Sequence, residues 1–244
     1  EAYICLALPN WGESKDGDGE FLSRIKENNK NSLWKLWTIV WWGGRDPSDY
    51  LPGLISLSGT GSIAYGRNDA GEEARAGGWD ERFSDEGSCY WLGMKSLELF
   101  SKESDGRAEK GALLEIFRNR FELKCDFDII DIFNRRYRMI ERNSRPSKIF
   151  VRSCPKRRFG SCKNVWDCGG WVGNDRWFRI PEVEIGEGTL VSYSGGLFHA
   201  GEFILGPLRE RLKTEGVRLC APKYTPVEGA SLLAAEMFDG ENNT

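Results

Sequence analysis

A glycine- and hydroxyl-rich turn between two short apolar segments constrains this chain more than any other feature. The segments at 54–57 and 62–66 alternate or run apolar, so the sequence predicts two strands joined by a tight turn. The turn consists of Ser58, Gly59, Thr60, Gly61 and Ser62. Glycine lets backbone N–H groups approach an anion, and the three hydroxyls can donate to phosphate oxygens. The turn therefore predicts a phosphate-holding loop, with an ordinary hairpin turn as the alternative.

Charge and hydropathy narrow the class of partner. The 244 residues carry 34 Lys+Arg and 37 Asp+Glu, a net charge of -3, which favours neither nucleic acid nor an anionic membrane. The basic run at 156–159 is therefore interpreted as a solvated loop rather than a nucleic-acid contact. No apolar run approaches the roughly 20 residues of a membrane span, and no basic-then-apolar leader is present. We expect a soluble, cytoplasmic protein whose partner is a small molecule or another protein.

The cysteines do not indicate a metal centre. Among the seven, Cys154, Cys162 and Cys168 cluster with spacings of eight and six, which fit no common zinc or iron–sulfur pattern. His199 is the single histidine, so no second imidazole is present to complete a cluster. We therefore expect no metal site built from protein side chains alone.

Apolar periodicity predicts an α/β layered sheet with flanking helices. Helices are expected at 88–100, 109–122, 128–139, 201–215 and 227–238, with further strands at 189–193 and 217–219. For the first helix we expect the apolar face to contain Tyr90, Met94 and Leu97. The intervals 28–50 and 143–187 show neither a helical nor a strand period of apolar residues. The acidic run at 15–20 is interpreted as a solvated turn.

Several motifs follow one another in a specific order. The chain has I-S-L-S-G-T-G-S-I-A-Y-G-R-N at 55–68, G-E-E-A-R-A-G-G-W at 71–79, D-E-G-S-C-Y-W-L-G at 85–93 and G-G-L-F at 195–198. In these motifs, and in P-V-E-G-A at 226–230, it resembles the N-acetylglucosamine kinase and BadF/BadG/BcrA/BcrD-type ATPase family. The resemblance implies an actin-like, ribonuclease-H-like fold. It assigns 51–244 to a C-terminal lobe and 1–50 to the remnant of an incomplete N-terminal lobe.

The resemblance also implies which residues bind which ligand. The residues implied for ATP are Ser58, Gly59, Thr60, Gly61, Ser62, Gly195, Gly196 and Glu228. The residues implied for an amino sugar are Gly77, Gly78, Asp85 and Glu86. Gly195 and Gly196 would lie against the adenosine, and Mg²⁺ would accompany the nucleotide. Asp85 and Glu86 fit helix capping as well, and Trp79 and Trp91 fit core packing.

The sequence also departs from the family pattern. It has no Gly-rich first phosphate hairpin, and Trp37, Thr38 and Ile39 stand where the family places its Asn-Asp pair, so the catalytic residue is unknown. The charged stretch 80–84 replaces the usual connection after Gly-Gly-Trp. One hypothesis covers 28–50 and 143–187, namely that both are degenerate or out-of-frame readings of kinase sequence.

Three functions are compatible with these observations. The first is an ATP-dependent kinase of an amino sugar such as N-acetylglucosamine. The second is a nucleotide-binding remnant with weak or no turnover. The third is the activator-ATPase branch of the family, whose cysteine signature is not visible here. A homodimer is expected only by analogy with the family.

Overall fold

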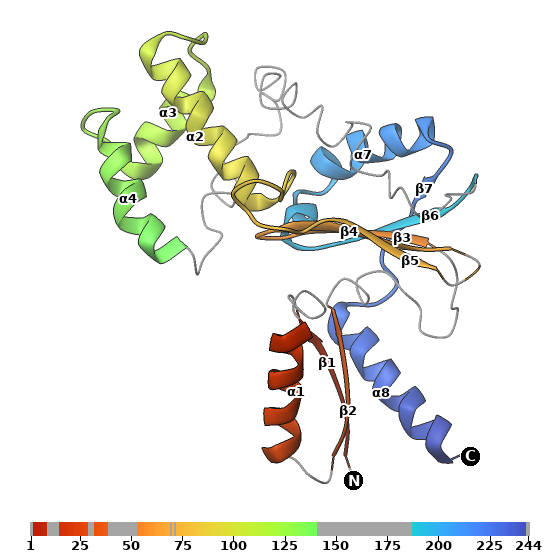
Figure 1. The fold of residues 1–244 in the computed structure, drawn as a ribbon. Coiled ribbons are helices and arrows are strands. Elements are labelled where there is room, and N and C mark those ends of the chain that lie inside the picture. The colour runs from red at the N-terminus through yellow and green to blue at the C-terminus, as the bar shows by residue number, and fades with distance from the viewer. Residues whose placement is uncertain are drawn as a thin grey trace.

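The computed structural model describes residues 2–8, 15–28, 32–38, 53–68, 70, 72–140 and 187–242. Two groups of elements are visible in Figure 1: a small unit with the N-terminus and the last helix, and a larger sheet that carries the remaining helices. The three clustered cysteines, the basic run at 156–159 and almost all of the interval 143–187 lie outside the described residues.

The small unit is a parallel β-α-β arrangement. Strand β1 (Ala2–Leu8) pairs with β2 (Ser32–Thr38) from Ala2↔Ser32 to Leu8↔Thr38. Parallel neighbours need a crossover connection, and α1 (Lys15–Asn28) lies in that connection. Helix α8 (Pro226–Asn242) contacts β1, so the two ends of the chain meet here (Figure 1).

Two expectations for this region were wrong. The run 15–20 is not a turn but the first part of α1, where Asp16 and Asp18 lie at the positive helix end. Leu22 and Ile25 continue the half-buried side that Asp18 begins, at spacings of four and three residues. The interval 28–50 is not wholly irregular either, because β2 occupies 32–38. Trp and Leu suit a strand, but the preceding Asn-rich run obscures that pattern in the sequence.

The large sheet has the strand order β5-β4-β3-β6-β7. Strands β3 (Gly53–Ser58), β4 (Ser62–Arg67) and β5 (Glu73–Gly77) form an antiparallel meander. Strands β6 (Leu190–Ser194) and β7 (Arg218–Leu219) add in parallel on the other side of β3. An antiparallel meander followed by parallel strands is the ribonuclease-H-like arrangement that the motifs imply, so the α/β prediction is confirmed.

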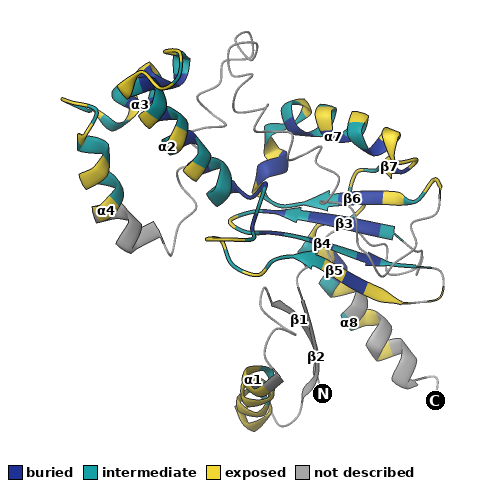
Figure 2. Cartoon of the chain, turned by 45° about the horizontal axis from the view of Figure 1, so that its top comes forward, coloured by how far each residue is buried: buried dark blue, intermediate teal, exposed yellow. Residues whose placement is uncertain are grey.

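One face of this sheet is covered by helix α7 (Glu202–Thr214) and the short 3-10 helix η4 (Gly196–Ala200) (Figure 1). The buried residues of α7 recur at spacings of four, which places one side of the helix against the sheet. Figure 2 shows burial along β3, β6 and the inner side of α7, whereas most of α1 is exposed. The buried core consists of Leu54, Ala74, Cys89, Val191, Leu197, Phe198, Ile204, Leu208, Leu212 and Val217.

Helices α2 (Cys89–Asp105), α3 (Ala112–Phe121) and α4 (Asp128–Ile140) form an arm beside the sheet (Figure 1). Phe100 and Phe117 stack at its centre with ring centroids 5.2 Å apart, and Leu113 and Leu114 are buried beside them. The three predicted helices are confirmed in place, together with those at 201–215 and 227–238.

The predicted inner face of α2 was only partly right. Met94 is exposed and Tyr90 and Leu97 are half-buried. Counting apolar residues misses the buried face of α2 because small residues and the carboxylate of Glu103 occupy part of that face. That carboxylate has a structural role, since Glu103 accepts the Leu114 N–H at 2.9 Å at the start of α3. The buried positions of α2 are Cys89, Gly93, Ser96, Phe100 and Glu103.

Candidate functional site

The loop at 58–62 is fixed to the turn that precedes α2. The Ser58 hydroxyl donates to the Gly87 carbonyl at 2.8 Å, and the Ser62 hydroxyl donates to the Glu86 carbonyl at 2.6 Å. Both serines are buried, with Ser58 fully so. Their hydroxyl hydrogens are therefore used within the protein, so the two hydroxyls do not donate to phosphate in this arrangement.

The backbone of this loop is also joined to α2. Cys89 and Tyr90 donate their N–H groups to the carbonyls of Gly59 and Thr60, at 2.8 and 3.3 Å. The first N–H groups of a helix have no partner inside the helix, so these bonds satisfy two of them. The Gly59 N–H donates to Gly61 O at 2.9 Å. The N–H groups of Thr60 and Gly61 have no acceptor among the described residues, and Thr60 is exposed.

Asp85 is the buried carboxylate of the site. It is 8% exposed, the Ser62 N–H donates to its carboxyl group, and Oδ1 has no hydrogen-bond partner among the described residues. Burial raises the pKa of Asp85, the Ser62 N–H opposes the rise, and the carboxylates of Glu81, Asp80 and Glu86 add to it. A buried acceptor without a donor is costly, which is typical of a group that a ligand completes.

A glycine is required where Asp85 meets the loop. A Cβ added to Gly61 would overlap Oδ2 of Asp85 and lie 3.2 Å from its Cγ. The absence of a side chain at Gly61 thus lets the carboxylate lie against the loop. This contact joins one residue implied for the sugar to one implied for ATP.

Ser88, rather than Asp85 or Glu86, caps α2 with its side chain. Its hydroxyl oxygen accepts the Trp91 N–H at 3.0 Å. Asp85 contributes its backbone instead, because the Ser88 N–H donates to the Asp85 carbonyl at 3.1 Å. The side chain of Asp85 is thereby left for another role.

Gly77 and Gly78 lie at the end of β5, beside the loop. Their φ angles are 75° and 66°, a backbone conformation that residues with a side chain rarely adopt. A Cβ added to Gly78 would meet Ile63 Cδ1 at 2.8 Å. These glycines are therefore required by the backbone whether or not a sugar binds there. The prediction that Trp79 packs in the core was wrong, since it is 77% exposed. Trp91 is half-buried.

The charged stretch 80–84 closes into a compact turn. Arg82 donates to both carboxylate oxygens of Asp80 at 2.8 Å, and the N–H of Ser84 donates to the Asp80 carbonyl at 2.9 Å. The Arg82 side chain lowers the pKa of Asp80 to about 2. Phe83 is 72% exposed, so two large aromatic side chains, Trp79 and Phe83, flank this turn on the surface.

Gly195 and Gly196 differ sharply. Gly195 has φ 112° and ψ 167°, and an added Cβ would overlap the Ser58 carbonyl oxygen and lie 3.0 Å from the Gly59 N. Glycine is required at 195 by contact with the loop itself. Within the described ranges, no heavy atom lies within 4 Å of a Cβ added to Gly196. Of the two, Gly196 is the one with open space for the adenosine that the resemblance implies.

Glu228 lies at the start of α8 and completes a capping box. Its carboxylate accepts the N–H and the hydroxyl of Thr225, both at 2.8 Å. These bonds lower the pKa of Glu228. Helix α8 does begin at Pro226 as expected, while a contact of Glu228 with ATP stays a prediction.

The contacts thus bring together most of the implied residues. The loop at 58–62 meets Gly195 on one side and the segment 85–87 on the other, whereas the contacts of Glu228 lead to Thr225. Sequence reasoning missed the carbonyls of Glu86 and Gly87 as the acceptors for the two serines. The sequence signal that could have indicated this contact is that both motifs, Ser-Gly-Thr-Gly-Ser at 58–62 and Asp-Glu-Gly-Ser at 85–88, occur in the order of the family pattern.

The described part of the chain contains neither a metal-binding cluster nor a membrane span. Within the described ranges, no group of three or more His, Cys, Asp or Glu side chains could hold a metal ion. Among the helices of that same part of the chain, none is long and apolar enough to cross a membrane.

Comparison with known proteins agrees with the motifs. The model of the BadF/BadG/BcrA/BcrD ATPase family matches residues 48–153. The N-acetylmuramic acid/N-acetylglucosamine kinase of Clostridium acetobutylicum is 43% identical over 83 residues, which are 34% of this chain and 27% of that kinase. The matched segment therefore spans about a quarter of the length of this curated relative.

Two solved structures resemble the whole arrangement. A candidate N-acetylglucosamine kinase from Chromobacterium violaceum aligns with a TM-score of 0.69 and 23% identity, over 95% of this chain and 75% of that one. Another from Porphyromonas gingivalis aligns with a TM-score of 0.56 and 17% identity, over 88% and 72% of the two chains. At these identities the likeness shows the fold, which is the actin-like, ribonuclease-H-like one.

Proposed function

We propose that this chain is part of an ATP-dependent kinase that phosphorylates an amino sugar such as N-acetylglucosamine, because residues 48–153 match the model of the BadF/BadG/BcrA/BcrD ATPase family. In this proposal the loop at 58–62 holds the terminal phosphates of ATP, and Asp85 binds a hydroxyl of the sugar. The contact between Gly61 and Asp85 is the observation that carries the proposal, since the residue proposed for the sugar lies against the loop proposed for ATP.

The phosphate half rests on the backbone of the loop. The N–H groups of Thr60 and Gly61 have no acceptors in the described part of the chain and can donate to a phosphate oxygen, and the exposed Thr60 can add its hydroxyl. In phosphoryl transfer, catalysis consists mainly of positioning and charge stabilisation. Rigid N–H donors suit that task because Cys89 and Tyr90 already fix the loop from behind.

The sugar half rests on Asp85. Its Oδ1 is buried without a donor among the described residues, and a sugar hydroxyl would supply one. Leaving such a group unpaired costs about 1–3 kcal/mol, which ligand binding would recover. Gly77 and Gly78, which the resemblance also implies for the sugar, lie at the end of β5 next to Ile63 and Ser62.

Mg²⁺ fits the proposal through the nucleotide rather than through a protein cage. The described residues hold no group of three metal-binding side chains. Magnesium in kinase sites is usually bound by one or two carboxylates together with substrate phosphates and water. When bound, it would neutralise phosphate charge. We assign no described residue to it.

A second candidate is a nucleotide-binding protein with little or no turnover. Strand β2 ends with Trp37 and Thr38, at the distance from the loop where the family resemblance expects a catalytic carboxylate. A general base contributes roughly 10²- to 10⁴-fold to a rate. This observation favours slow or absent transfer with binding retained.

Calorimetric titration with Mg²⁺-ATP, with and without N-acetylglucosamine, tests both halves, followed by an ADP-release assay on the same sample. Thr60→Ala should weaken ATP binding, with Thr214→Ala as the control at an exposed threonine on α7. Asp85→Asn should weaken sugar binding, with Asp105→Asn as the control at the far end of α2. Sugar-dependent ADP release supports a kinase, and binding without release supports the second candidate. If neither ligand binds, both proposals fail.

A further inference from the structure

The turn beside Asp85 carries an unusual concentration of negative charge. Residues 80–86 contain Asp80, Glu81, Asp85 and Glu86 against a single cation, Arg82, which gives this segment a net charge of -3 from four acids and one base. The proposed sugar kinase function does not use this charge, and the inference below rests on that proposed function.

The nearby cations are already occupied. Arg82 donates to both oxygens of Asp80 at 2.8 Å, so this pair is close to neutral when viewed from outside. Arg75 donates to the Gly78 carbonyl at 3.1 Å, on the strand that leads into the turn. Among the described residues, the neighbouring charges that act on the Asp85 carboxyl group are negative: those of Glu81, Asp80 and Glu86.

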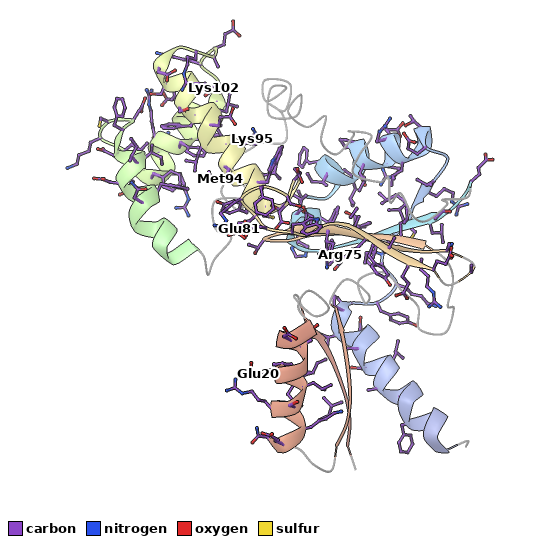
Figure 3. The ribbon with its side chains drawn as sticks, viewed as in Figure 1. Glu20, Arg75, Glu81, Met94, Lys95 and Lys102 are labelled. Atoms are coloured by element: carbon purple, nitrogen blue, oxygen red, sulfur yellow. The ribbon has the colours of Figure 1, made fainter. Side chains whose placement is uncertain are left out.

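The acidic turn leads directly into Asp85, the residue proposed to bind the sugar. Asp85 is buried with Oδ1 unpaired among the described residues. Glu81 is exposed on the turn that leads to Asp85, and Figure 3 shows it beside the beginning of α2. Glu81 is the first of the three neighbouring carboxylates whose charge acts on Asp85, so a molecule that donates a hydroxyl to Asp85 would meet that charge as well.

We propose that the acidic turn selects against sugars that carry a carboxylate, and that Glu81 is the residue that sets this preference. The site then takes neutral N-acetylhexosamines and disfavours N-acetylmuramic acid, whose lactyl group ends in a carboxylate. Like charges at a few ångströms repel, and the effect is strongest where protein replaces water on one side. The kinase from Clostridium acetobutylicum carries both sugars in its name, which makes them natural probes for this chain.

Size must be separated from charge in the test. N-acetylmuramic acid is bulkier than N-acetylglucosamine, so the matched probe is its methyl ester, which has nearly the same bulk and no charge. We expect the wild-type chain to bind the ester roughly tenfold more tightly than the acid at low salt. Raising the salt should reduce this ratio, because screening weakens interactions between exposed charges.

Substitution then assigns the effect to Glu81. Glu81→Gln should lower the ester-to-acid ratio to about threefold, and Glu81→Lys should bring it to about one or reverse it. Glu109→Gln is the matched control, since it removes one exposed carboxylate beyond the far end of α2 and should leave the ratio unchanged. Binding is measured by calorimetry, so no turnover is needed.

The outcomes separate this inference from the function on which it rests. If N-acetylglucosamine and the ester bind, and the acid binds as tightly as the ester, the sugar site stands and charge selection is refuted. The same holds if the ratio does not respond to Glu81→Gln or Glu81→Lys. If no sugar binds, the sugar-site proposal fails and takes the selectivity with it.

Discussion

Two adjacent glycines allow a stringent test of the site. Gly195→Ala and Gly196→Ala are the same chemical change at neighbouring positions, one residue apart on the segment that faces the 58–62 loop. Gly195 has a backbone conformation that L-residues avoid and contacts the Ser58 carbonyl, whereas Gly196 faces open space. We expect the first substitution to damage folding and the second to leave folding intact.

The magnitude follows from two contributions at Gly195. Placing an alanine at φ 112° and ψ 167° costs of order 1–3 kcal/mol in backbone strain. Relieving the overlap with the Ser58 carbonyl costs about 1–3 kcal/mol more, as in other overpacked sites. Together they amount to a loss of about 2–6 kcal/mol, which corresponds to a fall in Tm of roughly 4–24 °C at about 2–4 °C per kcal/mol for a chain of this length. Gly196→Ala has neither contribution, so its Tm should stay within about 2 °C of the wild type.

Thermal unfolding followed by circular dichroism measures both variants side by side, and ATP titration then compares nucleotide affinity. A Tm of Gly195→Ala equal to that of wild type would show that the loop does not hold the tight contact described, and the reasoning would be wrong. Gly196→Ala is also informative in binding. If it folds normally and loses ATP affinity, the open space at 196 belongs to the nucleotide, and unchanged affinity would remove Gly196 from the site.

Three further substitutions test other contacts. Ser58→Ala should cost about 1–3 kcal/mol in the free energy of unfolding, because the buried Gly87 carbonyl loses its donor, and urea denaturation against Ser101→Ala at an exposed serine checks this. Glu103→Gln should lower stability in acid by about 1–3 kcal/mol, because the amide has one oxygen to offer the N–H groups of Leu114 and Gly111 where the carboxyl group has two. Burial raises the pKa of Glu103, so ionisation of this carboxyl group opposes folding. The difference in the free energy of unfolding between wild type and Glu103→Gln should therefore shrink as pH rises through the pKa of Glu103 in the folded state. A difference that grows with pH would contradict this. Glu228→Ala should loosen the start of α8 near neutral pH, because the ionised carboxylate accepts the bonds from Thr225 and these bonds lower its pKa. The difference from wild type should disappear in acid, where the Glu228 carboxyl group is protonated. A difference that persists in acid would refute the capping role.

Much of the large sheet could be predicted because local and global signals agree there. Alternation at 62–66 and the glycines at 59 and 61 specify the β3–β4 hairpin, and the apolar spacing at 113, 114 and 117 specifies the buried side of α3. The motif order assigned the two segments to ATP and to the sugar without predicting that they touch. Contacts between Ser62 and Glu86, and between Gly61 and Asp85, join residues of two separate motifs.

Other features depend on tertiary contacts that no local pattern encodes. The acidic residues at 16 and 18 suggest a turn, yet they stabilise the positive end of α1. Glu103 interrupts the inner face of α2 because it serves the N-terminus of α3, eleven residues later. The serine hydroxyls of the loop looked suited to phosphate, but carbonyls brought near by folding compete for the same hydrogens.

The hydrogen bonds that Cys89 and Tyr90 donate to the loop at 58–62 connect the N-terminus of α2 rigidly to that loop. Its 17 residues extend about 25 Å from the loop toward the Phe100–Phe117 stack and α3. A rotation of about 5° at the loop end moves the far end of such a helix by roughly 2 Å. The rigid connection means that a shift of the loop backbone at Thr60 would be carried along α2 to the helical arm, and a fluorophore on the α2–α3 connection would report it.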